Sequence, residues 1–448
     1  MTSQRRSRAA TTRRKALKLL AGAGAGLYLG QAGRIARAAE TPTEIRLFDY
    51  KLTEIGAEEV LKKLVADFEK QHPSIKVKLE EVSWPDHFKK LIILIQGGNP
   101  PDVARISDAD IFPLAGIGAL APVTDWIEKN NKADTTLAQI PPAVRASLRY
   151  KGADVFMPMA ATGLDILAWN KNYFQAANLD PGKPPTTWDE LVSTAKKLTD
   201  PSKDRYGWAV VSDRSTSTSR RVIRWIVSGG GAIFNEDGTE FIANRPEGLK
   251  GYQFWADLAL KHKVVPPGSI NVPIRDVLNM YGQGRIGMYD TGPNTIKIAD
   301  VDFPGNVAKT QMSAMPDPWR PPLLCAGFAV MNASKKKEAA ALLASFLTTA
   351  NSQVEYAIGS YEVPIRADVA ADPRLKGHPF LATAVALTKR GVPNPGLHIK
   401  YAEIEDKLFD AIQATLSGAK TPKQALDDAA NDANKILARW KERQAGSR

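Results

Sequence analysis

The order of strand and helix signals near the start of the chain most constrains its fold. Residues 44–50 (EIRLFDY) and 75–82 (IKVKLEEV) have the pattern of strands, and a third apolar run begins at Val103. Between the first two, residues 57–70 place apolar side chains on one face of a helix. Ser83 can cap a second helix before the third run. This alternation predicts a doubly wound α/β lobe.

A second group of elements begins near residue 164. Residues 164–169 are almost entirely apolar and predict a buried strand, which ends at the polar pair Asn170-Lys171. After a short helix and a proline-rich loop, Thr187 and Glu190 form a capping box at the start of another helix. Further helix and strand signals lie at residues 219–227, 244–261, 276–290, 323–331 and 334–348, and the chain ends in two predicted helices.

The first 38 residues are predicted to be an export signal. Residues 1–18 contain seven Lys or Arg and no acidic residue, and an apolar run and the small-residue site Ala36-Arg37-Ala38 follow. The segment TRRKALK at residues 12–18 is similar to a twin-arginine export motif. The apolar run is short for a membrane span, and no Cys lies nearby, so we expect a cleaved leader without a lipid anchor. An uncleaved basic membrane anchor is the alternative.

Removing this leader changes the charge of the chain. Residues 1–38 contain nine Lys or Arg and no acid, so the formal net charge falls from +12 to +3 without them. The basic balance that would favour a nucleic-acid partner therefore belongs to the leader, and we expect no such partner. The remaining length is enough for two domains. The single Cys325 can form no internal disulfide and lies in an apolar run.

The sequence contains no motif that demands catalysis. Residues 282–287 satisfy G-x-G-x-x-G, but a helix precedes them and a strand follows, the reverse of a dinucleotide site. The five histidines form no H-x-x-x-H pair for zinc. Paired acids, such as Asp108 with Asp110 or Glu403 with Glu405, leave a glycosidase dyad open. We expect a binding protein with no cofactor and no metal, and not an enzyme.

Three motifs, taken in order, indicate a family. They are LIQGGNPPDV at residues 94–103, WNK with PPTTWDEL at residues 169–191, and YEVPIR at residues 361–366. This order resembles the extracellular, or periplasmic, solute-binding proteins of ABC importers, in the sugar-binding family 1 that includes maltose-binding protein. The resemblance covers nearly the whole chain after the leader.

The resemblance implies an α/β, two-lobed fold of the type II periplasmic-binding-protein class, with a ligand cleft and a hinge between the lobes. The expected N-terminal lobe comprises residues 39–160 and 308–350, and the C-terminal lobe residues 161–307 and 351–448. The implied function is capture of a carbohydrate or sugar derivative and its delivery to the transmembrane subunits of an ABC permease. The protein would be a soluble, periplasmic monomer exported by the twin-arginine pathway.

Candidate ligand-binding residues were selected by position, at the carboxyl ends of strands and at helix N-termini. They are aromatic, acidic, amide and Arg side chains, which suit the apolar faces and hydroxyls of sugars. The set comprises Asp49, Tyr50, Trp84, Asp86, Asp108, Asp110, Arg220, Arg221, Asp290, Asn294, Tyr361, Glu362 and Tyr401.

Several of these residues have a second interpretation. Trp84 and Asp108 can serve as core or capping residues instead of ligand contacts. Arg220 and Arg221 suit an acidic ligand, or else form a solvated basic turn. Residues 290–294 lack the Gly-x-Trp segment frequent in the family, so a non-sugar solute such as a polyol phosphate or organic anion remains open. A secreted glycan hydrolase is the third hypothesis.

Overall fold

The computed structural model describes residues 41–54, 56–130, 136–162, 164–366, 368–378, 380–395 and 397–446. The expected leader, residues 1–38, lies outside these residues, and so does its proposed cleavage site. From Pro42 onward the chain forms one compact unit. Over the described ranges, no helix has both the length and the apolar character needed to cross a membrane.

The first lobe is built around a sheet with the strand order β11–β6–β10–β3–β1–β2, and β12 pairs with β10. β1 is parallel to β2 and β3, whereas β10 is antiparallel to β3 and β6. Every residue of β3 and β10 is buried, which explains the continuous apolar sequence of β10, whereas β3 also buries Arg105. The strands are β1 (Thr43–Asp49), β2 (Ile75–Glu81), β3 (Val103–Ser107), β6 (Met157–Thr162), β10 (Pro322–Val330), β11 (Val363–Pro364) and β12 (Val392–Pro393).

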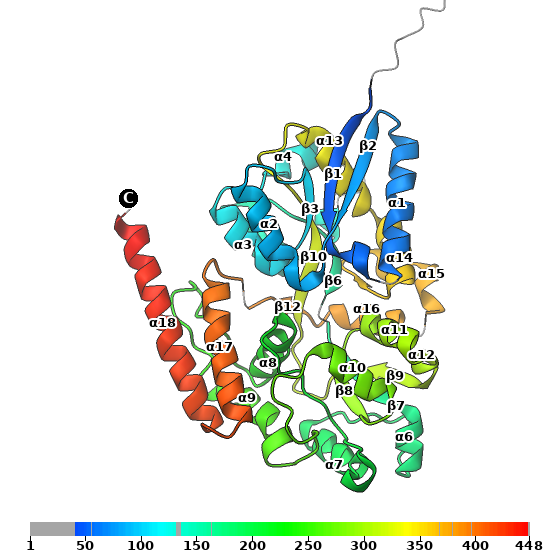
Figure 1. Ribbon diagram of the computed structural model, residues 1–448, viewed down its shortest axis with the longest axis vertical. Helices are drawn as coiled ribbons and strands as arrows, with labels where there is room; N and C mark the ends of the chain where they lie inside the picture. The colour runs from blue at the N-terminus through cyan, green and yellow to red at the C-terminus, as the bar shows by residue number, and fades with distance from the viewer. Residues whose placement is uncertain are drawn as a thin grey trace, which may run out of the picture. The chain divides into compact units, whose positions relative to one another are not determined.

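Helices cover both faces of this sheet, as the upper part of Figure 1 shows. The predicted helix at 57–70 is confirmed as α1, which buries Leu61, Leu64 and Phe68 and packs against α14. The α-helices of this lobe are α1 (Ala57–Gln71), α2 (His87–Gln96), α3 (Asp108–Gly116), α4 (Thr124–Asn130), α5 (Pro142–Ser147), α13 (Lys337–Leu347) and α14 (Ala350–Ser360). The short 3-10 helices η1 (Tyr50–Thr53), η2 (Trp84–Asp86) and η3 (Thr136–Gln139), and the strands β4 (Arg149–Tyr150) and β5 (Ala153–Asp154), complete it.

The second lobe has a smaller antiparallel sheet, in which β7 (Ile166–Asn170) lies between β8 (Met288–Thr291) and β9 (Thr310–Ser313). All five residues of β7 are buried, as predicted from its apolar sequence. The helices that follow β7 are α6 (Lys171–Ala176), α7 (Trp188–Leu198), η4 (Pro201–Lys203), α8 (Thr216–Ser228), α9 (Pro246–Leu260), α10 (Ile274–Gly282), α11 (Pro293–Asp302) and α12 (Asn306–Lys309). Those after β11 are η5 (Asp368–Ala371), α15 (Pro373–Lys376), α16 (Leu381–Thr388), α17 (Tyr401–Leu416) and α18 (Pro422–Gly446).

Helix α8 is held close to α9 by glycine. A Cβ atom on Gly251 of α9 would overlap the carbonyl oxygen of Trp225 on α8, so only glycine permits this approach. The contact fixes α8, whose first two turns carry Ser217, Arg220 and Arg221. The backbone contact of α9 therefore determines where these side chains lie.

The chain passes between the two lobes three times: from β6 to β7, from β9 to β10, and after β12, where α17 and α18 pack on α9. Two of these crossings differ from the expected lobe boundaries. Residues 310–313 pair with β7 in the second sheet, although residues from 308 were assigned to the first lobe. Residues 363–364 pair with β6 in the first sheet, and α14 packs on α1, although residues from 351 were assigned to the second lobe. Strands of two and four residues carry too little periodicity to be read from sequence.

Candidate ligand-binding cleft

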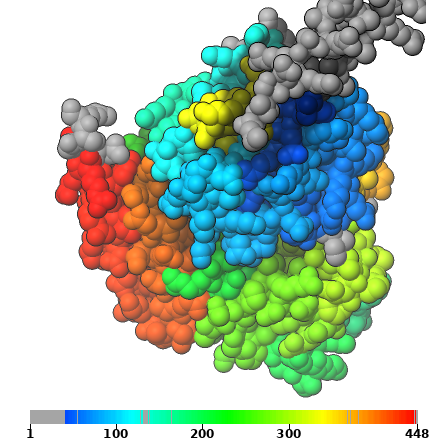
Figure 2. Space-filling view, turned by 45° about the horizontal axis from the view of Figure 1, so that its top comes forward, coloured from blue at the N-terminus to red at the C-terminus, as the bar shows by residue number. Residues whose placement is uncertain are grey.

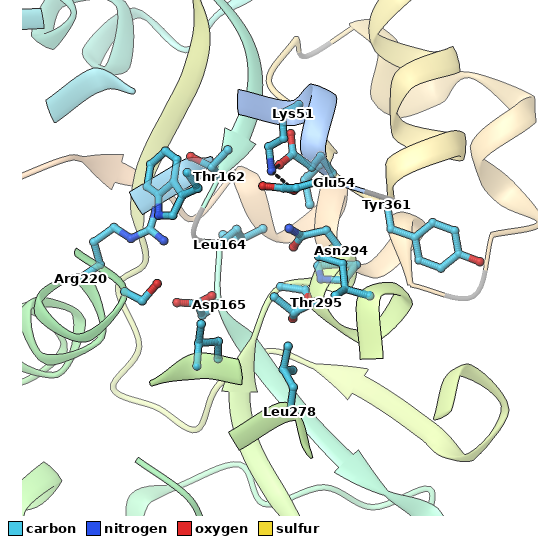
Figure 3. Close-up of a pocket in the computed structure, with 18 of the residues that line it drawn as sticks. Lys51, Glu54, Thr162, Leu164, Asp165, Arg220, Leu278, Asn294, Thr295 and Tyr361 are labelled. Carbon is cyan, nitrogen blue, oxygen red and sulfur yellow. Dashed lines mark hydrogen bonds and ion pairs between the residues drawn. The ribbon is translucent and has the colours of Figure 1, made fainter. Parts of the chain in front are cut away.

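A cavity of about 430 Å³ lies between the two lobes and takes residues from both. On the molecular surface, the blue and cyan atoms of the first lobe meet the green atoms of the second across the face shown in Figure 2. The first lobe contributes η1 with the residue after it, η2, the end of β6 and the segment before β11. The second contributes the start of β7, α8, α10 and the N-terminus of α11 (Figure 3).

Aromatic rings form one wall of the cavity. Tyr50 follows β1, and its ring meets the edge of Trp84 at a centroid distance of 4.7 Å. Trp84 in turn stacks on His87, with centroids 4.5 Å apart and planes inclined by 15°. The rings of Tyr50 and Trp84 both line the cavity. This wall offers the apolar surface against which a C–H face of a sugar can pack.

A buried cation with two carboxylates lies beside this wall. Nζ of Lys51 is 2.6 Å from Glu54 and 2.5 Å from Glu362. Burial opposes the charge on Lys51, but the two carboxylates outweigh this effect and raise its pKa. Oε1 of Glu362 takes this ion pair, whereas its Oε2 is buried and has no hydrogen-bond partner in the part of the chain that the structure describes. Glu362 therefore retains a free acceptor at the cavity.

Two arginines and two aspartates form an ion-pair cluster in the second lobe. Arg224 on α8 binds Asp165 and also Asp290, the latter at 3.1 Å. Arg221 lies 3.6 Å from both carboxylates and donates to the backbone carbonyl of Asp290. Burial opposes ionisation of Asp165, but Arg221 and Arg224 hold its pKa below the usual value. For Asp290 burial dominates and raises the pKa.

Arg220 differs from its two neighbours on α8. Its guanidinium makes no hydrogen bond or ion pair with any described residue, and its Nε is completely buried. Its carbon Cζ lies 6.0 Å from the ring centroid of Trp84, on the other lobe. Burial lowers the pKa of Arg220, because the charged form is removed from water without a direct counter-ion.

Seven of the thirteen predicted ligand residues line the cavity, namely Tyr50, Trp84, Arg220, Arg221, Asn294, Tyr361 and Glu362. Tyr401 lines a second, much smaller cavity together with Arg220 and Asn394. Asp108 is buried beside this smaller cavity, where it accepts hydrogen bonds from Asn394 and from the backbone N–H of Cys325. Burial raises the pKa of Asp108 to about 7.

The other four predicted residues are engaged elsewhere and do not line the cavity. Asp49 pairs with Arg105 and caps η1. Asp86 is exposed and accepts a hydrogen bond from Ser83. Asp110 caps α3 and contacts His87, and Asp290 belongs to the ion-pair cluster of α8.

Sequence reasoning did not select several cavity residues, notably Lys51, Glu54, Thr162, Asp165 and Ser217. Lys51 and Glu54 follow β1, so the rule that selected Tyr50 also applied to them. Asp165 lies just after the first crossing, before β7, where no strand end marks it. Among the described residues, no three of His, Cys, Asp and Glu lie close enough together to hold a metal ion.

Comparison with known proteins places the chain in a family. Residues 54–354 match the family model described as "Bacterial extracellular solute-binding protein". The chain therefore belongs to this family of extracellular solute-binding proteins, as its motifs predicted.

Two solved structures and one sequence relative show the likeness in detail. An ABC transporter solute-binding protein from Thermotoga lettingae, bound to α-D-tagatose, has a TM-score of 0.78 and 26% identity, covering 88% of this chain and 100% of that one. An ABC substrate-binding protein from Listeria monocytogenes, in complex with cycloalternan, has a TM-score of 0.77 and 25% identity, with coverages of 89% and 99%. A maltotriose-binding protein of Pyrococcus abyssi is 24% identical over 332 residues, 72% of this chain and 67% of its own. The predicted two-lobed α/β fold is confirmed.

Proposed function

We propose that this protein is the substrate-binding component of an ABC importer and captures a carbohydrate or sugar derivative between its lobes. The observation that carries the proposal is the composition of the cavity. Its walls combine the rings of Tyr50 and Trp84 with a buried carboxylate, Glu362, and the guanidinium of Arg220, which no described residue pairs. A sugar needs this combination, because its ring has apolar faces and its hydroxyls need hydrogen-bond partners.

The relatives named above support this choice of solute, since they are bound to, or named for, a monosaccharide and oligosaccharides. The cavity of about 430 Å³ lies toward the lower end of the range of roughly 300–1,000 Å³ typical of small-molecule sites. A solute of one or two rings fits this volume better than a long oligosaccharide.

The mechanism is closure of the two lobes on the solute. Tyr50, Trp84 and Glu362 belong to the first lobe, and Arg220 and Asn294 to the second. A solute that contacts both sets favours the closed arrangement, because only closure brings all its partners together. The three crossing segments would supply the hinge, and the closed form would dock on the permease.

Export and assembly form part of the same proposal. The basic leader would direct the chain through the twin-arginine pathway to the periplasm, where it would act as a soluble monomer without a lipid anchor. Its family consists of binding proteins, and we propose that the chain carries out no reaction on its solute.

A thermal-shift screen of the purified protein tests the proposal, with neutral mono- and oligosaccharides, sugar acids, polyol phosphates and amino acids as probes. A solute present at about 100 times its Kd adds roughly 2.7 kcal/mol to the free energy of unfolding. A raised melting temperature with sugars, and recovery of the sugar unchanged, is the expected result. Stabilisation by amino acids alone would refute the carbohydrate proposal, and consumption of the sugar would point to the hydrolase.

A further inference from the structure

The charged groups of the cavity are almost all paired within the protein. Lys51 binds Glu54 and Glu362, and Arg221 and Arg224 share Asp165 and Asp290. Arg275, at the edge of the cavity, binds Asp302 at 2.5 Å. Among the described residues that line the cavity, the guanidinium of Arg220 makes no hydrogen bond or ion pair, and its Nε and Oε2 of Glu362 are buried polar atoms without a partner.

These two groups reach the cavity from different lobes. Figure 3 shows Arg220 approaching from α8 on one side, while Lys51, the partner of Glu362, approaches from η1 on another. Asp165 and Leu164 lie between the two sides in this view. A solute in the cavity can therefore contact the free cation with one end and the free carboxylate oxygen with the other.

The nearby acids do not neutralise Arg220. Asp108 and Glu405 act on it through space, without an ion pair. Glu405 is hydrogen-bonded to Ser219, and burial raises the pKa of both Asp108 and Glu405. Each acid therefore holds its proton more readily than an exposed one, and Asp108 with its pKa of about 7 is only partly charged near neutral pH. The remaining acid, Asp165, is already shared by Arg221 and Arg224.

Burying a guanidinium without a partner carries a free-energy penalty, which a ligand that pairs with the guanidinium can offset. A planar carboxylate fits its fork with two parallel hydrogen bonds, which a neutral hydroxyl cannot supply. Among the described residues that line the cavity, only the guanidinium of Arg220 has no hydrogen bond or ion pair, so a single negative charge balances it better than a doubly charged phosphate does. Oε2 of Glu362 can only accept, which calls for a hydroxyl donor elsewhere on the solute.

We propose that the solute is a sugar acid, with its carboxylate on Arg220 and a ring hydroxyl donated to Oε2 of Glu362. The proposal rests on the carbohydrate function given above and narrows it to acidic sugars of one or two rings. Arg220 is thereby the residue that determines specificity for the acid over its neutral parent.

Calorimetric titration of the purified protein with matched solutes tests this inference. The pairs are galacturonate with galactose and glucuronate with glucose, which differ at the carboxylate alone, and glycerol 3-phosphate serves as the phosphate probe. We expect at least one acid to bind roughly 10- to 100-fold more tightly than its neutral parent, as charge-assisted hydrogen bonds imply. High salt should reduce this ratio.

Variants of Arg220 test whether this residue causes the preference for the acid. R220M should lose the preference for the acid, because its binding of the acid weakens more than its binding of the neutral parent, and R220K should retain part of the preference. R214M is the matched control, because Arg214 belongs to the same lobe but is exposed and pairs with Asp406 and Asp410. The wild-type ratio requires no variant, so a folding defect in R220M would not leave the inference untested.

The outcomes separate the inference from the function on which it rests. Tighter binding of neutral sugars than of their acids would overturn the inference and leave the carbohydrate function standing. Binding of glycerol 3-phosphate but of no sugar acid would overturn both the sugar-acid inference and the carbohydrate function. An acid preference that survives in R220M would refute the role of Arg220.

Discussion

Asp49, the last residue of β1, accepts a hydrogen bond at 2.9 Å from Nε of Arg105 on β3, and neither side chain is exposed to solvent. Arg105 also lies 4.8 Å from the ring centroid of Phe328 and 5.0 Å from that of Tyr356. The pair thus joins two strands directly beneath the aromatic wall of the cavity. Its charges belong to the framework of the site and are not offered to the solute.

Removing the negative charge of this pair should destabilise the protein strongly. D49N leaves Arg105 buried without a counter-charge, and we expect a loss of about 3–5 kcal/mol in the free energy of unfolding. Urea denaturation measures it. R245M provides the control, because Arg245 and its partner Glu240 are both about half exposed, and surface pairs contribute roughly 0–1 kcal/mol. Equal losses in the two variants would contradict this prediction.

The same substitution at Arg220 and at Arg224, one turn apart on α8, should have different effects on the stability of the protein. R224M leaves Asp165 and Asp290 with only the longer contacts of Arg221, so we expect a loss of roughly 3–5 kcal/mol. R220M removes a cation that has no direct partner, so the stability without solute should stay the same or rise. Thermal unfolding of the two variants without added sugar makes the comparison. A greater loss in R220M would mean that Arg220 has a structural partner.

Asp108 should make stability fall as the pH rises. Burial raises its pKa from 3.8 to about 7, so between these values the folded protein keeps a proton that the unfolded chain releases. Stability from this group is therefore greatest at about pH 4 and declines toward about pH 7, by up to about 4 kcal/mol. D108N cannot titrate. Urea unfolding of both proteins across this range should show the wild type losing stability relative to D108N, and a constant difference would argue against the raised pKa.

The glycine contact between α8 and α9 gives a prediction about packing. G251A should favour the helix by about 1 kcal/mol, but its methyl group overlaps the backbone of Trp225, and overpacking of this kind costs roughly 1–3 kcal/mol or more. We therefore expect net destabilisation and weaker solute binding, because α8 carries Arg220. G377A is the control, since a Cβ atom there meets nothing within 4 Å. Denaturation and titration of both variants would show whether G251A is instead tolerated.

The sequence predicted the aromatic wall of the cavity better than the buried ion pairs beside it. Tyr50 and Trp84 could be selected because each follows a strand of the predicted lobe, and the structure places both at the cavity. The same rule selected Asp49, which instead faces Arg105 on another strand. The rule also applies to Lys51, but it does not predict the ion pair of Lys51 with Glu362, a residue far away in the chain. Pairing across such separations leaves no periodic signal in sequence.

The alternation of strands and helices predicted two α/β lobes, but it did not predict to which lobe each short strand belongs. β9 and β11 have four and two residues, and their membership is determined by their partners β7 and β6. The sequence also could not show that Arg220 lacks an ion pair with a described residue, since Arg220, Arg221 and Arg224 are the same residue type on one helix. Only the positions of Asp165 and Asp290 distinguish them.

The position of β10 affects how the chain can acquire its structure during synthesis. This strand lies between β3 and β6, yet its residues 322–330 are made long after both neighbours. The first lobe therefore cannot join β3 to β6 until about three quarters of the chain has been made, and closing such distant contacts is slow. Until then the apolar edges of β3 and β6 lie open to other chains. A variant that weakens β10 would accordingly reduce the yield of folded protein more than its equilibrium stability suggests.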